Sequence, residues 1–101
     1  MTPQQARRVL MELAQDGPPR LKDAHHYEEG LLEISRECGD QAGCFSKIVM
    51  EDLSKILGKR EAEVVIHYMP PRWQSDPRAV VAGLTDIFHG GADVILRMMV
   101  P

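Results

Sequence analysis

The chain has 101 residues, of which 44% are hydrophobic and 27% are charged, and its formal net charge is −3 at pH 7. This length fits one domain with one core, and the composition argues against a disordered chain. Acidic and basic residues are mixed in both halves, which argues against a nucleic-acid partner because phosphate binding depends on clustered Lys and Arg.

The amino-terminal segment has no features of a targeting signal. No apolar segment follows Arg7 and Arg8, and no uncharged run reaches the roughly 18 residues of a membrane span. The sequence therefore predicts neither secretion nor membrane insertion, and we expect a cytoplasmic protein.

Helix signals begin at the second residue. Thr2 and Pro3 suit a cap and a first helical position, and Gln5 can complete a capping box, which predicts a leading helix within 1–17. Gly17-Pro18-Pro19 ends it. A second helix is expected over about 21–38, with its seam residues spaced three and four apart: Ala24, Tyr27, Leu31, Ile34 and Cys38.

A third helix is expected after Gly39-Asp40, with Asp40 as its cap, and ends at Gly58. A fourth helix ends at Met69, because Pro70-Pro71 cannot continue it. We expect the stretch Leu53–Met69 to be the packing centre of the domain. The apolar residues of its second helix that can go inside are Ala62, Val64, Val65, Ile66 and Met69.

Two further helices complete the prediction. Asp76-Pro77 begins the fifth, which stops at His89-Gly90-Gly91, and the last runs from Ala92 to Val100. No strand-like alternation of useful length occurs. The sequence predicts one all-α domain over 1–101, a compact bundle of about five to six short helices.

The carboxy-terminal half, 53–100, carries a recognisable succession of motifs. Leu57-Gly58 is followed by Glu61-Ala62-Glu63, by His67-Tyr68, and by Ile87-Phe88-His89-Gly90-Gly91-Ala92. This succession resembles the archaeal Nitrosopumilus output domain, fifth type. The resemblance implies a helical output or interaction module of archaeal signalling chains, with no assigned reaction.

A metal site would have to use His25, His26, Cys38 and Cys44. Adjacent helical histidines point about 100° apart, and five residues between the cysteines is not a usual zinc spacing. We therefore predict no metal and no cofactor. In the cytoplasm the cysteines are expected to be reduced, and a Cys38–Cys44 disulfide across the Gly39 turn is the alternative.

Catalytic motifs are missing from the sequence. His89-Gly90-Gly91 is similar to the His-Gly-Gly loop of esterases, but no Gly-x-Ser-x-Gly elbow accompanies it, and phosphate-binding glycine motifs do not occur. We predict that the protein is not an enzyme.

Two aromatic positions have alternative interpretations. His67 and Tyr68 either line a ligand pocket or leave the Tyr ring packed in the core, and the sequence favours the core. Trp73 either projects as an interface residue or covers its own core, and the core is again favoured.

The apolar end of the last helix must be buried by the fold or by a partner. The interface candidates are Trp73, Ile95, Met98, Met99 and Val100. The leading hypothesis is a non-enzymatic interaction module that acts as a homodimer or binds a protein partner. The alternatives are a small ligand- or metal-binding regulator, and then a DNA-binding regulator built on the Leu57-Gly58-Lys59-Arg60 corner.

Overall fold

Helix α5 (Pro77–Phe88) is the element around which the other helices pack. The structure is a computed structural model, and it describes residues 2–8 and 24–100. Half of the 12 residues of α5 are buried. It contacts helices on several sides: α2 (Ala24–Cys38), α4 (Lys59–Tyr68), α6 (Ala92–Met99) and the short 3₁₀ helices η1 (Pro71–Gln74) and η2 (His89–Gly91).

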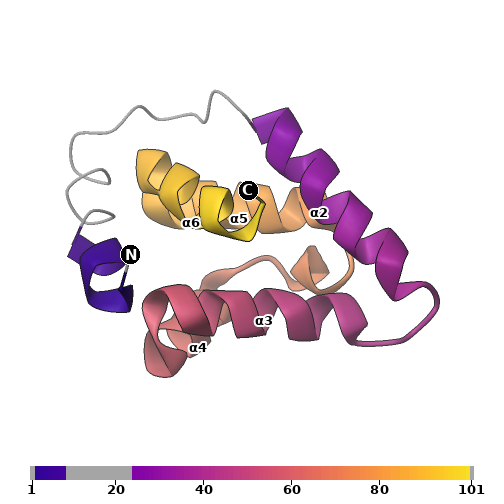
Figure 1. Ribbon diagram of the computed structural model, residues 1–101, viewed down its shortest axis with the longest axis horizontal. Coiled ribbons are helices and arrows are strands. Elements are labelled where there is room, and N and C mark those ends of the chain that lie inside the picture. The colour runs from indigo at the N-terminus through magenta and orange to yellow at the C-terminus, as the bar shows by residue number, and fades with distance from the viewer. Residues whose placement is uncertain (1, 9–23, 101) are drawn as a thin grey trace.

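Helix α3 (Cys44–Leu57) closes the bundle by packing against α2, α4 and α6. In Figure 1, α3 runs below α6, and α2 runs diagonally along the right-hand side of the bundle. The described residues contain helices and turns but no strand, and their buried apolar side chains form one core cluster. The predicted all-α bundle is confirmed.

Side chains cap two helices where the sequence predicted them. Residues 3–8 are helical, and the Gln5 backbone N–H donates to Thr2 Oγ1 at 3.2 Å while the Thr2 N–H donates to Gln5 Oε1 at 3.0 Å. At α5 the Arg78 N–H donates to Asp76 Oδ1 at 3.0 Å. The remainder of the predicted 1–17 helix, and the start of the second at 21–23, lie outside the described residues.

The turn between α2 and α3 differs from the prediction. Asp40 does not cap α3, because the helix begins at Cys44 with Gly43 in the capping position and no side-chain cap bond. Gly39 and Gly43 have φ of 62° and 78°, so the chain reverses through two left-handed residues. Chain reversal therefore depends on the two glycines rather than on an aspartate cap.

The Leu53–Met69 stretch is a corner of the bundle rather than its centre. Gly58 joins α3 to α4 with φ 94°, a conformation that side chains other than glycine rarely adopt. Leu53, Leu57 and Ala62 on the two sides of the corner are buried, but α5 contacts more elements. The expectation that Leu53–Met69 is the packing centre is therefore wrong. The packing centre is α5, which contacts more of the other helices.

The break between α5 and α6 falls at His89, which has φ 51° and ψ −127°. The 23-residue stretch Pro77–Met99 is long and apolar enough to be a candidate membrane span by length and composition. In its most apolar 18-residue window, 56% is buried inside the protein. However, α5 has 12 residues, α6 has 8, and the two pack against each other. Neither helix alone reaches the roughly 30 Å of a bilayer core.

Two glycines let segments approach closely. A Cβ on Gly30 of α2 would lie 2.1 Å from Val100 Cγ1, and a Cβ on Gly83 of α5 would lie 2.9 Å from Pro70 Cδ. Val100 is 7% exposed, so the end of the described chain is packed onto α2. Gly30, an unfavourable residue inside a helix, is thereby explained by a close approach.

Candidate interaction surface

The outer face of α4 carries the most exposed large apolar side chains of the described residues. Val64 is 54% exposed and Tyr68 is 72% exposed. They are four residues apart, and Arg60 precedes Val64 by the same spacing, so the three side chains form a row along one side of the helix. Val65, one position on, is 7% exposed and points into the core.

His67 lies beside this row. Its ring centroid is 5.4 Å from that of Tyr68, with an interplanar angle of 85°. Tyr68 is therefore not the core residue that the sequence favoured. Neither of the two pockets described below includes His67 or Tyr68. Both residues belong to an exposed helix face, which we call the α4 face and define by Arg60, Val64, His67 and Tyr68.

The apolar end of α6 lies mostly in the core. Ile95 is fully buried, and three further candidates are buried too: Met99, Val100 and Trp73. These four residues, predicted as interface candidates, are instead part of the monomer core. Only Met98, 41% exposed, remains available to a partner. The favoured core position of Trp73 is confirmed.

The two cysteines form a disulfide, with Cα atoms 5.8 Å apart. The expectation of reduced thiols is therefore wrong for this structure, and the alternative applies. His25 and His26 are exposed on α2, where His25 Nε2 lies 4.0 Å from Glu29 Oε1. Within residues 2–8 and 24–100, no three side chains of metal-binding type come together. The structure thus does not assemble the candidate ligands into one site.

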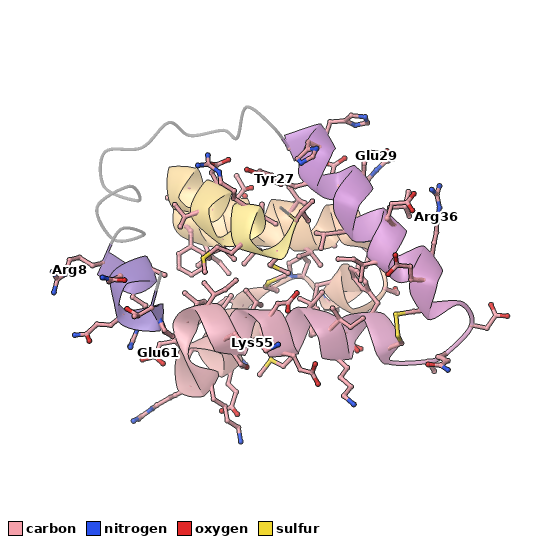
Figure 2. All side chains as sticks on the ribbon, viewed as in Figure 1. Arg8, Tyr27, Glu29, Arg36, Lys55 and Glu61 are labelled. Carbon is pink, nitrogen blue, oxygen red and sulfur yellow. A yellow bond between two sulfur atoms is a disulfide. The ribbon has the colours of Figure 1, made fainter. Side chains whose placement is uncertain are left out.

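A polar cluster connects α2 to α6. The Tyr27 hydroxyl donates to Asp93 Oδ1 at 2.5 Å, and Arg97 forms an ion pair with Asp93. Figure 2 shows Tyr27 between α2 and α6. Burial, and then the bond to Asp93, raise the pKa of Tyr27. Tyr27 therefore stays protonated at neutral pH, and its hydrogen bond to Asp93 links α2 to α6.

Two open pockets lie on the described surface. One, of about 320 Å³, is lined by Glu28, Glu29, Asp76 and Arg78 together with Leu32 and Pro77. Arg78 Nε lies 3.9 Å from Glu28 Oε2, so part of this acidic charge is already balanced. The other, of about 210 Å³, lies beside the disulfide and includes Cys38, Phe45, Gln74 and Ser75.

The expectation that Val64 packs inside is wrong, because its side chain is 54% exposed, although the sequence carried a signal for this position. The buried positions of this segment, Ala62, Val65 and Met69, are spaced three and four apart. A helix that buries this stripe must point positions 64 and 68 away from it. Strict counting of the helical register therefore places Val64 and Tyr68 outside, whereas apolar character alone does not.

No protein-family model, curated protein or solved structure matches the chain. The resemblance to the Nitrosopumilus output domain thus stays a prediction.

Proposed function

We propose that the protein is a non-enzymatic interaction module that pairs with a second copy of itself through the α4 face. The observation that carries this proposal is the exposed row of Val64 and Tyr68 on one side of α4. Tyr is enriched among the residues that dominate binding energies, and partners usually cover apolar side chains of this kind.

Charge along α4 favours a second copy in antiparallel orientation. Lys59 and Arg60 lie at the amino-terminal end of the helix, where the helix dipole disfavours positive charge. In an antiparallel pair they lie beside the carboxy-terminal end of the other copy, where positive charge is favoured. A two-fold axis at Val64 places Arg60 opposite Tyr68, four residues to either side, and a guanidinium on an aromatic face is attractive.

The size of this surface predicts modest affinity. α4 has 10 residues and is about 15 Å long, so its face is smaller than the roughly 800 Å² per partner of a standard interface. We expect a concentration-dependent dimer, which suits a switchable signalling module. The resemblance to an archaeal output domain supports the same class of function.

The test is the molar mass in solution by light scattering behind size exclusion, over a range of concentrations. The 11.4 kDa chain should approach twice that mass as concentration rises, and Val64→Asp should keep it monomeric. Met98→Asp is the matched control, because it adds the same charge at an exposed apolar position on α6. If Met98→Asp abolishes pairing and Val64→Asp does not, the α4 assignment is wrong.

The alternative functions predict different results in the same preparation. A stoichiometric metal in elemental analysis would favour the ligand-binding regulator. Salt-sensitive retention on DNA would favour the DNA-binding regulator, for which Lys59 and Arg60 would contact phosphate. A chain that stays monomeric at every concentration would contradict the homodimer.

A further inference from the structure

The disulfide lies at one end of the bundle, where the last residue of α2 meets the first residue of α3. Figure 2 shows it as a yellow bond beside the turn that joins these helices. Both cysteines are half-buried, and all five residues between them are exposed. A Cβ on Gly39 or Gly43 would have no neighbour within 4 Å, so little packs against this turn. The disulfide is therefore close to solvent.

The helices on either side are held by other contacts. Tyr27 and Leu31 of α2 and Phe45 and Val49 of α3 are buried in the common core. Backbone bonds also order the turn, from the Gly39 N–H to the Arg36 carbonyl at 3.0 Å and from the Cys44 N–H to the Gln41 carbonyl at 3.3 Å. Opening the disulfide should therefore leave the bundle folded, so that it can close again.

The two sulfurs occupy electrostatically different places. Cys44 is the first residue of α3, whose first turn holds no acidic residue and whose capping position offers no side-chain bond. The helix dipole there stabilises a thiolate. Cys38 is the last residue of α2, at the end where the helix dipole disfavours negative charge. Cys44 is thus the better leaving group, since a more stable thiolate leaves faster.

The neighbouring pocket is lined by one of the two cysteines. Cys38 lines the cavity of about 210 Å³ and Cys44 does not. Ser35, Gln74 and Ser75 supply polar groups to its wall, and Phe45 supplies an apolar surface. A small thiol held in this pocket would therefore lie beside Cys38.

We propose that the Cys38–Cys44 disulfide is a reversible thiol–disulfide exchange site for a low-molecular-weight thiol, which attacks at Cys38. In the first step the incoming thiolate bonds to Cys38 Sγ, the Sγ–Sγ bond breaks, and Cys44 leaves as a thiolate. In the second step another thiolate attacks the sulfur of the bound small thiol and releases Cys38. Two thiols are oxidised to one small-molecule disulfide, and the two cysteines are reduced by the same two electrons. The proposal is independent of pairing through the α4 face.

The first test uses the full chain and reduced glutathione as the probe. Samples are quenched with acid during reduction, and the adduct is located by peptide mass spectrometry. We expect the mixed disulfide on Cys38, and circular dichroism of the fully reduced chain should show unchanged helix content. An adduct on Cys44 overturns the proposed direction of attack. A disulfide that resists glutathione until the protein unfolds, or helices lost on reduction, shows a purely structural bond.

The second test compares the two single thiols. Cys38→Ser leaves Cys44 free, and Cys44→Ser leaves Cys38 free, so each variant is the control for the other. A helix-dipole effect of roughly 1 kcal/mol gives Cys44 about fivefold more thiolate than Cys38 below the pH at which a free thiol ionises. Because a more acidic thiol is also a weaker nucleophile, Cys44 should react with iodoacetamide about two- to threefold faster. Equal rates, or a faster Cys38, overturn the assignment of Cys44 as the leaving group.

Discussion

Gly30 shows how one missing side chain determines where the end of the described chain lies. The space that a Cβ would need is occupied by Val100, a β-branched residue with a stiff side chain. Val100 therefore packs directly on the backbone of α2, and the end of α6 is held against the bundle.

We predict that Gly30→Ala destabilises the protein. Alanine gains about 1 kcal/mol of helix propensity, but a contact of 2.1 Å to Val100 Cγ1 forces a displacement that typically costs about 1–3 kcal/mol. The net loss should be about 1 kcal/mol, measured by denaturant unfolding. Adding Val100→Ala should recover part of that loss in a double-mutant cycle, whereas additive effects would show that the two residues are not coupled.

Asp52 on α3 is a half-buried carboxylate that acts against stability at neutral pH. Burial raises the pKa of its carboxyl; Lys55 opposes this effect, and Glu51 adds to it. The pKa of Asp52 is higher in the folded than in the unfolded chain. Its carboxyl therefore contributes to the free energy of unfolding below the unfolded pKa near 3.8, and this contribution is lost as the pH rises through the folded pKa.

Asp52→Asn should therefore raise the Tm at pH 7, and its advantage should shrink at pH 3, where the carboxyl is neutral in both states. Thermal unfolding at the two pH values measures this difference. Asp40→Asn, in the exposed turn, makes the same change of net charge and serves as the control. An equal rise in Tm for both variants would indicate an effect of net charge rather than of the burial of Asp52.

At the scale of elements, α6 is an amphipathic helix whose apolar side is already covered. Ala92, Ile95, Leu96 and Met99 are buried, and Asp93 and Arg97 lie on the polar side with Tyr27. α6 is thus a core helix of the monomer, and Met98 is its exposed large apolar residue.

Met99→Asp should destabilise the fold by about 3 kcal/mol or more, because it removes core packing and buries a carboxylate. Met98→Asp should cost less than about 1 kcal/mol, since the side chain stays in solvent. Helix content and denaturant midpoints of the two variants check this contrast. Similar losses for both would mean that Met98 is also covered.

At the scale of the whole molecule, the α4 face is exposed in the part of the chain that the structure describes. Pairing through it requires no rearrangement of the core, because Val64 and Tyr68 are already exposed. The orientation of the two copies then decides which residues meet across the interface.

Substitutions at Tyr68 distinguish the two orientations. In the antiparallel pair Tyr68→Glu lies opposite Arg60 of the other copy, whereas Tyr68→Lys places two positive charges together. We expect Tyr68→Glu to dimerise about tenfold more tightly than Tyr68→Lys at low salt. The net charge of −3 works against this difference, because the Tyr68→Glu chain is more negative and two such chains repel each other more strongly than two Tyr68→Lys chains. Equal weakening by both substitutions would favour a parallel pair.

Local interactions account for what the sequence determined by itself. Helix bounds follow from caps, prolines and glycines within a few residues, as at Thr2, Asp76 and Gly58. The apolar faces of α2, with Tyr27 and Leu31, and of α3, with Val49 and Leu53, follow from the 3.6-residue period of a helix. All four residues are buried.

Only the tertiary structure decided which neighbour covers each apolar face and which distant residues meet. Gly30 accommodates Val100, Tyr27 binds Asp93, and Cys38 lies next to Gln74 and Ser75 in one pocket wall. These contacts join residues that are far apart in the chain. Periodicity identifies the face that a helix can bury, but it does not name the neighbour that covers it. Met99 and Val100 therefore belong to the core because of where α2, α3 and α5 pack.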